Sequence, residues 1–445
     1  MRNLRLLLRL SLGALLLSLP ACDLLDDLST TEDLDVLDDV GDIRDVTPDT
    51  TPGDTTQPDA TTDTRPPTDV ATDTTDAEED TVPPPPPCPR DDRSSEQGPR
   101  TLLLGLNYEA DGGEGRRLRT LTLQQDGTIA DNGVTIDVGQ RLTQIVFAAN
   151  GLFAYGIGES YELLTIEARS AGSVEVIERT TLPGAGYRSL RLSPDGQRLH
   201  VVGFNSTTEG GGIHAFYIAC DGTLQRDAEA YAPVVLASDL AFVDDDVAVV
   251  AGGQRTFDTP ILEDVRLMRW TGFGWDELFA GDFFAESVRS GRIAVAPDRS
   301  LIALPNNGTF TAEGGAVLLL RREGDTLVEV QRLTGLEDVE DAWFSPDGQT
   351  LIVNEVEPGR IAVFRRQGAS FVASTPVTGL GLPDYVTMVL RGNQQGRVLV
   401  PSVRPAGNST ITVLNVSAPG QVQVTSTFQL GNGVENIPGP IAVRP

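Results

Sequence analysis

The sequence predicts an all-β fold, a seven-bladed β-propeller, over residues 99–445 of the 445-residue chain. Three observations lead to this prediction. A short apolar motif recurs every 45 to 53 residues, each unit divides into four short strands, and the last strand completes the first unit. A period near 40–50 residues is typical of propeller blades or of a solenoid.

The recurring motif predicts the first strand of each unit. It is clearest at residues 190–197 (LRLSPDGQ) and 342–349 (AWFSPDGQ), with a weaker copy at 293–298. Degenerate copies lie at 145–147, 240–242, 388–390 and 441–443. The Pro-Asp-Gly tripeptide favours a tight turn, so a second strand is expected after each copy, for example at 199–202 and 351–353.

A third strand is expected in all seven units, and each copy precedes a short Gly-containing turn and a fourth strand. These third strands are 119–123, 162–167, 213–218, 266–270, 316–320, 361–364 and 411–416. Short Gly turns between alternating apolar segments are the usual signal of β-hairpins. Seven first strands and seven third strands give seven blades, and no segment of the head has a convincing amphipathic helical pattern.

The two ends of the head predict how the ring closes. The head begins at 101–106 with a second strand, and 441–443 supplies the missing first strand. Pairing both termini in one blade is the "velcro" closure that leaves no open sheet edge. A solenoid has no reason to end on the strand that its beginning lacks.

The N-terminus has the pattern of an export signal. Arg2, Arg5 and Arg9 precede an apolar run at 10–19 that is too short to span a bilayer. The run ends in Leu-Pro-Ala-Cys, which resembles the lipobox of bacterial lipoproteins. The resemblance implies that residues 1–21 are a cleaved signal peptide and that Cys22 is lipid-acylated. It also implies a protein anchored in the cell envelope outside the cytoplasm, at the periplasmic face or the cell surface. An ordinary secretory signal with a chance Cys is the alternative.

Residues 22–98 read as a disordered acidic linker rich in Asp, Thr and Pro. Segment 23–98 contains 23 acids and four Arg, and 83–87 is a run of five prolines. Such a segment cannot bury enough apolar surface to offset its ordering entropy, and proline runs are stiff. We expect a passive tether that holds the head away from the membrane.

Charge and cysteine content restrict the partners. The whole chain carries −30 and the head remains net negative, which argues against nucleic acid and anionic lipid surfaces. Membrane contact is therefore expected only through the lipid anchor, and the head is expected to be a monomer. Cys88 and Cys220 could form a disulfide in an oxidising compartment, and two free thiols are the alternative.

The Ser-Pro-Asp-Gly turn and its flanks resemble the YVTN, lactonase-like and WD-like bacterial propellers. Propellers of the 6-phosphogluconolactonase type carry Pro-Arg-His before the strand that enters this turn. Here Arg188 matches the Arg, and Ser189 stands where the His would be. The only two histidines, His200 and His214, lie in blade three, where we expect structural roles. The resemblance thus lacks the imidazole that could act as general acid or base.

Other catalytic motifs are missing from the sequence. It has no CxxC pair, no His cluster with metal-ligand spacing, no GxSxG elbow and no phosphate-binding Gly loop. We therefore predict no catalytic residues, no metal and no cofactor, although Asp and Asn side chains could build a calcium or polyol site.

The expected ligand face is the one with long loops, at 108–115, 205–212, 252–264, 305–315, 354–359 and 401–409, because the opposite face has only tight turns. The loops and the links between blades supply the candidate ligand residues, each expected to be a solvated loop residue unless several converge. They are Glu109, Asp111, Arg188, Glu209, Asp239, Arg255, Asp258, Asn306, Asn307, Asp341, Glu355, Glu357, Asp384, Arg404 and Asn436.

Two functions remain open from the sequence. The first is a non-catalytic binding or scaffold lipoprotein whose long-loop face contacts an envelope protein or glycan. The alternative is a lactonase-like or other hydrolytic propeller that uses carboxylates or a metal on that face. An enzyme requires charged groups with strongly shifted pKa values that converge at the channel mouth.

Overall fold

The computed structural model describes most of the head. The described residues are 98–109, 114–158, 160–170, 172–183, 186–203, 211–234, 236–252, 264–284, 291–307, 314–383, 385–390, 394–403, 409–431 and 436–445. Their secondary structure is entirely β, and they contain no helix long and apolar enough to cross a membrane. Residues 1–97, which hold the predicted signal peptide and nearly all of the predicted acidic linker, lie outside the described residues.

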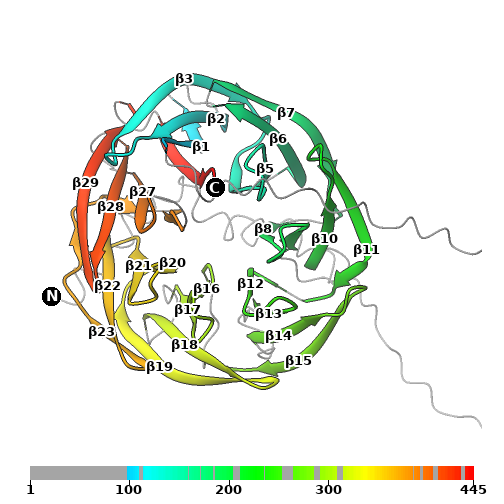
Figure 1. Cartoon of the computed structure of the whole chain (residues 1–445), viewed down its shortest axis with the longest axis vertical. Coiled ribbons are helices and arrows are strands. Elements are labelled where there is room, and N and C mark those ends of the chain that lie inside the picture. The colour runs from blue at the N-terminus through cyan, green and yellow to red at the C-terminus, as the bar shows by residue number, and fades with distance from the viewer. Residues whose placement is uncertain are drawn as a thin grey trace, which may run out of the picture. The chain divides into compact units, whose positions relative to one another are not determined.

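Seven antiparallel sheets stand around a central axis, as Figure 1 shows, and each sheet is one blade. Blade 1 comprises β30 and β1–β3, blade 2 β4–β7, blade 3 β8–β11, blade 4 β12–β15, blade 5 β16–β19, blade 6 β20–β24 and blade 7 β25–β29. The predicted seven-bladed propeller is therefore confirmed.

The strands fall into four positions from the axis outwards. First strands are β30 (Asn436–Val443), β4 (Leu142–Phe147), β8 (Tyr187–Leu192), β12 (Asp239–Phe242), β16 (Ala294–Val295), β20 (Val339–Phe344) and the divided pair β25 (Leu382–Pro383) and β26 (Thr387–Met388). Second strands are β1 (Arg100–Glu109), β5 (Phe153–Gly158), β9 (Arg198–Gly203), β13 (Val247–Ala251), β17 (Ile302–Asn306), β21 (Thr350–Glu355) and β27 (Arg397–Val403).

The outer positions complete each blade. Third strands are β2 (Glu114–Leu123), β6 (Glu162–Ser170), β10 (Gly212–Ile218), β14 (Val265–Trp270), β18 (Gly315–Glu323), β22 (Arg360–Gln367) and β28 (Thr410–Ala418). Fourth strands are β3 (Ile129–Asp137), β7 (Ser173–Thr181), β11 (Leu224–Ala232), β15 (Trp275–Gly281), β19 (Thr326–Leu336), β29 (Gln421–Gln429) and the divided pair β23 (Ser370–Ala373) and β24 (Val377–Thr378). Every predicted third strand lies within one of these elements.

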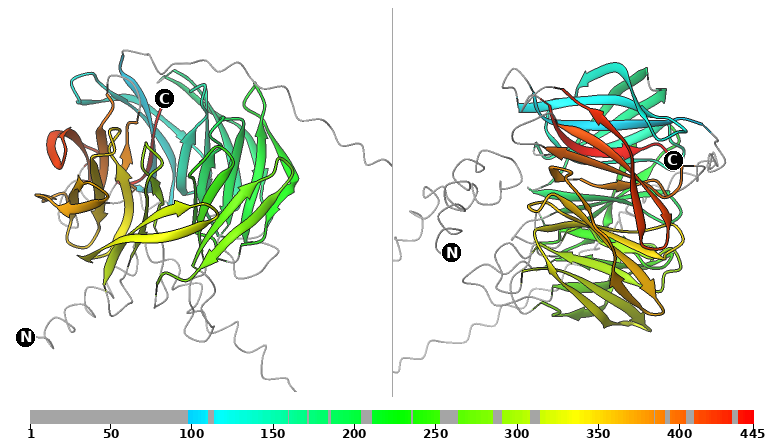
Figure 2. Two further views of the ribbon diagram at one scale, coloured as in Figure 1. Left: turned by 60° about the horizontal axis from the view of Figure 1, so that its bottom comes forward. Right: turned by 90° about the vertical axis from the view of Figure 1, so that its left-hand side faces the viewer.

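The ring closes as the sequence predicts. Strand β1 lies between β2 and β30, and its register pairs Leu102 with Val443 and Leu104 with Ile441. The C-terminus consequently lies near the centre of the ring, and the side view in Figure 2 places it at one end of the channel. The last strand of the chain thus removes the open edge that β1 would otherwise present.

The core consists of seven apolar clusters, one between each pair of neighbouring blades. Successive side chains of one strand enter different clusters. Leu102 and Leu104 pack towards blade 7, whereas Leu103 packs towards blade 2. Both faces of the second and third strands are therefore buried, which explains why these strands read as continuous apolar runs.

The repeated Ser-Pro-Asp-Gly segment is a self-contained turn. The N–H of Gln197 donates to the Asp195 carboxylate (3.0 Å), the N–H of Arg198 donates to Ser193 Oγ (2.9 Å), and Gly196 has φ +71°. The copy at 345–350 repeats these bonds. A left-handed φ suits Gly because it has no Cβ, so this motif specifies backbone geometry rather than chemistry.

Two ends of the ring are distinguished below. The turn face contains the turns between first and second strands and between third and fourth strands. The loop face contains the links between blades and the connections between second and third strands. Several loop-face segments are shorter than expected, because β17, β21 and β27 continue to pair with their neighbours as far as Asn306, Glu355 and Val403.

Candidate functional site

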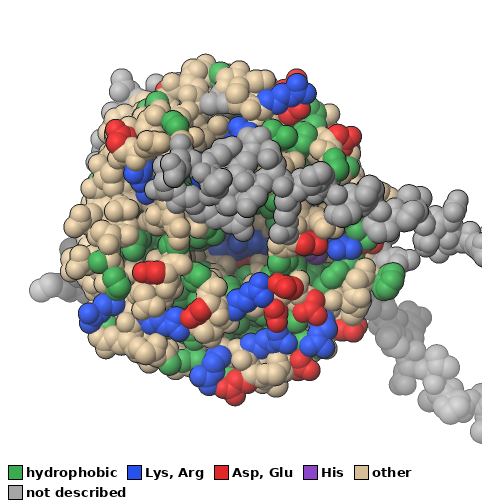
Figure 3. Space-filling model, viewed as in Figure 1, with side chains coloured by type: hydrophobic (Ala, Val, Ile, Leu, Met, Phe, Trp, Pro, Cys, Tyr) green, Lys and Arg blue, Asp and Glu red, His purple; other side chains and the backbone are tan. Residues whose placement is uncertain are grey.

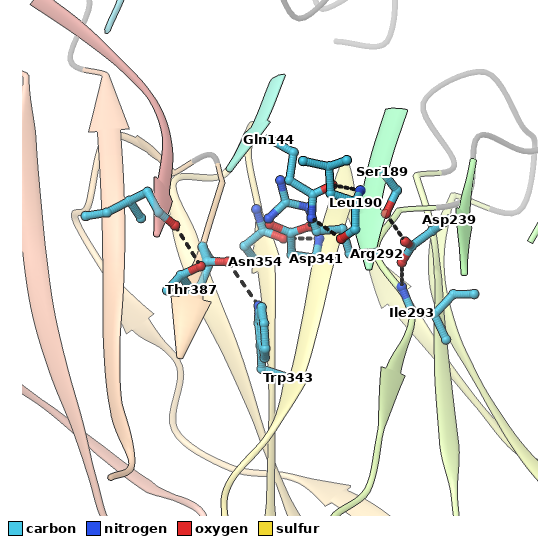
Figure 4. Close-up of polar contacts among 12 residues, drawn as sticks. Gln144, Ser189, Leu190, Asp239, Arg292, Ile293, Asp341, Trp343, Asn354 and Thr387 are labelled. Atoms are coloured by element: carbon cyan, nitrogen blue, oxygen red, sulfur yellow. Dashed lines mark hydrogen bonds and ion pairs between the residues drawn. The ribbon is translucent and has the colours of Figure 1, made fainter. Parts of the chain in front are cut away.

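The first strands line the central channel and run in the same direction. Arg292 and Asp341, in the first-strand segments of blades 5 and 6, form a parallel bridge. Figure 4 shows that polar side chains from several blades converge on this wall. Two ion pairs belong to this wall among the described residues: Arg191 on blade 3 with Asp239 on blade 4, and Arg292 on blade 5 with Asp341 on blade 6.

Asp239 joins three blades. Its carboxylate accepts hydrogen bonds from Ser189 Oγ and from the Arg191 guanidinium, whose Nε lies 3.0 Å from Oδ1. The backbone N–H of Ile293 donates to Oδ2 at 2.7 Å. Because the Asp239 side chain is only 1% exposed, these partners replace water as the solvation of its charge.

Asp341 is also buried but is less closely paired. Its Oδ1 lies 3.6 Å from Arg292 Nε, and its backbone N–H donates to Asn354 Oδ1. Burial raises the pKa of the Asp341 carboxyl and the nearby Asp239 raises it further, whereas the positive charges of Arg292 and Arg191 lower it. The Arg292 guanidinium also lies over the Tyr385 ring, 5.8 Å from its centroid.

The uncharged groups of the wall connect blades too. Gln144 of blade 2 accepts from the N–H of Leu190 (2.6 Å) and donates to its carbonyl (3.2 Å). Trp343 Nε1 donates to the Val386 carbonyl (3.0 Å), and Thr387 Oγ1 donates to the Ile441 carbonyl (3.1 Å). These bonds (Figure 4) link adjacent first strands, so much of the polar wall holds the ring together.

Five of the expected ligand residues are buried, and the expectation of solvated loop positions is wrong for them. Asp239, Asn306, Asn307, Asp341 and Glu355 are each at most 6% exposed. They lie in strands or directly at strand ends, where neighbouring blades cover them. The sequence predicts long loops at Asn306, Asn307 and Glu355 and links between blades at Asp239 and Asp341.

Some of these residues meet near the loop face of blades 5 and 6. Asn307 Nδ2 donates to Asp338 Oδ1 and to Glu340 Oε1, both at 2.7 Å. Glu355 pairs with the Arg360 guanidinium and accepts from a backbone N–H. Asp338, Glu340 and Arg360 were not singled out from the sequence, although each lies within three residues of a candidate residue.

The remaining candidates do not join this network among the described contacts. Arg188 lies half-buried in β8, Glu357 is exposed after β21, and the backbones of Glu109 and Asn436 pair across β1 and β30. Asp111, Glu209, Arg255, Asp258, Asp384 and Arg404 lie outside the described residues, as do Cys22 and Cys88.

The two histidines lie in strands of blade three, as expected, and His200 Nδ1 has no hydrogen-bond partner among the described residues. His214 packs against Tyr187 and Tyr231, and neither of its ring nitrogens has a hydrogen-bond partner within the described part of the chain. Burial lowers the pKa of His214 to about 4 and that of His200 to about 3. Both imidazoles are therefore neutral at pH 7 and buried among blade side chains.

A pocket of about 400 Å³ opens at the turn-face end of the channel, the face that the sequence suggested to be without a site. Its walls come from blades 3 to 7 and include Arg191, Phe242 and Trp343, together with the prolines of the repeated turns, Pro194, Pro297 and Pro346. Figure 3 shows a central hollow with basic side chains in its depth. The repeat motif was the signal for this pocket, because the same turns surround the channel.

The described residues contain no group of three or more His, Cys, Asp or Glu side chains arranged to hold a metal ion. Asp239 and Asp341 lie on the same wall, but Arg side chains and backbone N–H groups occupy the space around them. A calcium or polyol site built from Asp and Asn therefore has no support within the described ranges.

Asp264 is a carboxyl with a shifted pKa on the loop face of blade 4. Burial raises its pKa to about 7, although the N–H groups of Phe283 and Phe284 donate to it and oppose the shift. It precedes a third strand and so lies two strands outwards from the channel wall. Asp264, whose pKa is shifted to about 7, is therefore separate from the charged side chains that converge on the channel wall.

The raised pKa of Asp264 predicts a pH dependence of stability. The folded protein binds this proton more tightly than the unfolded chain, so the free energy of unfolding falls as pH rises from about 4 to about 7. Asp264→Asn stays neutral and is expected to remove this part of the fall. Urea unfolding midpoints of both proteins at pH 4.5, 6 and 8 measure the difference. A constant difference between the two proteins at the three pH values would contradict the assignment.

Comparisons with known proteins show the fold. No protein-family model matches the chain, and no curated protein sequence matches it significantly. A solved structure titled a putative 6-phosphogluconolactonase from Bacteroides uniformis is 16% identical and has a TM-score of 0.62. It covers 78% of this chain and 100% of its own. The periplasmic gluconolactonase of Pseudomonas aeruginosa is 15% identical with a TM-score of 0.57, covering 78% and 99%. The chain is thus a seven-bladed β-propeller with the fold of these lactonase-like structures.

Proposed function

We propose that this propeller is a non-catalytic binding module, held in the cell envelope by a lipid anchor at Cys22, that takes an envelope protein or glycan on its loop face. The observation that carries the proposal is the burial and ion pairing of Asp239 and Asp341 on the channel wall. Both are buried against arginines, and Asp239 also accepts from a backbone N–H. A hydrolase needs an acid or base that can reach substrate, and these groups are engaged in joining blades.

The proposed location outside the cytoplasm has support from a second observation. Cys220 is disulfide-bonded. Stable disulfides persist in oxidising compartments and are rare in the cytosol. This agrees with the export signal and the Leu-Pro-Ala-Cys segment that ends at Cys22.

The test compares recovery of partners from the native envelope. A soluble form of the full mature chain is expected to retain a defined protein or glycan, which is identified by mass spectrometry. Shortening 253–263 and 308–313 to Gly-Ser links should reduce recovery by about tenfold or more, the effect of losing a few interface side chains. Phe273→Ser is the matched control, because Phe273 is 78% exposed in a turn-face turn. Equal recovery by the trimmed and untrimmed proteins would reject the loop face as the binding surface.

Lactone hydrolysis is the second candidate. It is favoured by the lactonase names of two similar structures. It is also favoured by Arg191 and Arg292, whose side chains are 21% and 18% exposed on the channel wall. Gluconolactone and 6-phosphogluconolactone are the substrates to assay, by acid release above the spontaneous rate. Turnover that is lost in Asp341→Asn while the protein remains folded would replace the binding proposal with this one.

A further inference from the structure

The turn-face pocket follows from the residues that successive repeats place at one position of the first strand. The middle residue of the three-residue first-strand motif is large on blades 3 and 6 and small on blades 4 and 5. These residues are Arg191, Trp343, Ala241 and Ala294, and all of them line the pocket. Two small side chains thus stand between two large ones, and the missing side-chain volume leaves a cavity of about 400 Å³.

The walls of this pocket are mostly apolar. The last residue of the first-strand motif contributes one apolar side chain from each of blades 3 to 7. These side chains are Leu192, Phe242, Val295, Phe344 and Leu390. Leu390 is 49% exposed, so part of this apolar surface can be reached from the solvent. Cavities of about 300–1,000 Å³ with apolar walls and a few polar groups are typical sites for small organic molecules.

The aromatic wall of the pocket is held in place. Trp343 Nε1 donates to the Val386 carbonyl (3.0 Å), which fixes the indole and leaves its ring, rather than its N–H, to contact a ligand. Aromatic rings pack favourably against one another in offset or edge-to-face arrangements. Only Arg191 and Gln395 are polar among the described lining residues, so a polyol would leave most of its hydroxyl groups without partners. The wall therefore favours an aromatic ligand over a sugar.

Arg191 is the only charged residue among the described lining residues. Its Nε and Nη2 donate to the Asp239 carboxylate, and Nη2 also donates to the Ile293 carbonyl (3.2 Å). Its Nη1 has no hydrogen-bond partner within the described ranges, and the side chain is 21% exposed. Asp239 thus fixes the guanidinium while two N–H groups remain to donate. Such donors form their strongest hydrogen bonds with anionic oxygens.

We propose that the turn-face pocket binds a small aromatic carboxylate, with the carboxylate on Arg191 Nη1 and the ring against Phe242 and Trp343. The central hollow in Figure 3 is where this ligand would enter. The pocket and the loop face are at opposite ends of the ring, so this inference does not depend on what the loop face binds.

Isothermal titration of the full mature chain with 2-naphthoate tests the ligand class. The uncharged 2-naphthamide has the same rings, and gluconate has a carboxylate on a polyol. We expect 2-naphthoate to bind about tenfold more tightly than 2-naphthamide, because hydrogen bonds to charged groups contribute about 1 kcal/mol more than those between neutral groups. No saturable binding of 2-naphthoate up to about 1 mM, or tighter binding of gluconate, would overturn the proposal.

Substitutions at Leu390 test the place of the carboxylate with little risk to folding, since this side chain is half-exposed. Leu390→Glu brings a negative charge to the pocket, and Leu390→Gln is its uncharged control. At low salt, Leu390→Glu should bind 2-naphthoate at least about threefold more weakly than Leu390→Gln, through repulsion across the pocket. The two variants should bind 2-naphthamide equally. Equal affinities for 2-naphthoate would show that the anion binds elsewhere.

Two further variants separate the pocket from the surrounding surface. Arg191→Lys keeps a positive charge beside Asp239 but removes Nη1, and it should bind 2-naphthoate about tenfold more weakly and no longer prefer it to 2-naphthamide. Phe273→Ser removes an apolar side chain that is 78% exposed on the same face and should leave the affinity unchanged. Urea unfolding midpoints confirm that each variant is folded. Loss of binding in Phe273→Ser, or unchanged binding in folded Arg191→Lys, would overturn the proposal.

Discussion

Deleting residues 436–445 is expected to abolish cooperative folding of the propeller. The deletion removes β30, and with it Ile441 and Ala442, which pack into the clusters towards blades 7 and 2. It also uncovers Leu102 and Leu104 on β1. Burial of one such Leu or Ile side chain contributes about 1.5–3 kcal/mol. The combined loss is therefore comparable with the free energy of unfolding of a whole domain, about 5–15 kcal/mol.

Urea unfolding followed by near-ultraviolet circular dichroism measures this effect. The control deletes only Arg444 and Pro445. This costs the hydrogen bond from the Arg444 N–H to the Thr101 carbonyl (2.9 Å) and the exposed one from Arg444 Nη1 to the Arg169 carbonyl (3.3 Å). That loss is expected to be about 1 kcal/mol. If the longer deletion unfolded at the same urea concentration as the control, the closure through β30 would not be the element that holds the ring shut.

Asp239→Ala is expected to reduce the free energy of unfolding by about 3–5 kcal/mol. The substitution leaves the Arg191 guanidinium without its carboxylate and removes the acceptor for Ser189 and for the N–H of Ile293. Removing one member of a buried ion pair has costs of this size, because the partner's charge stays desolvated. Blades 3, 4 and 5 would lose their common contact at the channel wall.

The matched control is Asp245→Ala, which breaks the ion pair with Arg299 (2.8 Å) at a side chain that is 82% exposed. Exposed pairs contribute about 0–1 kcal/mol, so its unfolding midpoint should hardly move. Asp239→Asn keeps the shape and one acceptor oxygen and should lie between the two. If Asp239→Ala shifted the unfolding midpoint as little as Asp245→Ala does, Asp239 would not be a residue that connects the blades.

The blade count was predictable because its signals are local. In the Ser-Pro-Asp-Gly turn at 193–196, the hydrogen bonds from Gln197 to Asp195 and from Arg198 to Ser193 span two and five residues. Such contacts form wherever these residue types follow one another in a chain. The closure was predictable for a related reason, since an unmatched second strand at one end and an unmatched first strand at the other have only one arrangement that pairs both.

The candidate site was less predictable because its contacts are remote in sequence. Arg191 and Asp239 are 48 residues apart, and Asp239 and Ile293 are 54 apart. The sequence places Asp239, Asp341 and Glu355 beside loops, and composition alone makes them look solvated. Their burial results from the packing of neighbouring blades around them, which no local pattern encodes.

By itself, then, the sequence determined the seven blades, their four-stranded pattern and the strand that closes the ring, because turn chemistry and alternation act over a few residues. Only the tertiary structure decided that Asp239 and Asp341 on the channel wall form ion pairs between neighbouring blades. It also decided that a pocket opens at the turn face. Both depend on bringing first strands about 50 residues apart to one axis, where burial decides which charges must be paired.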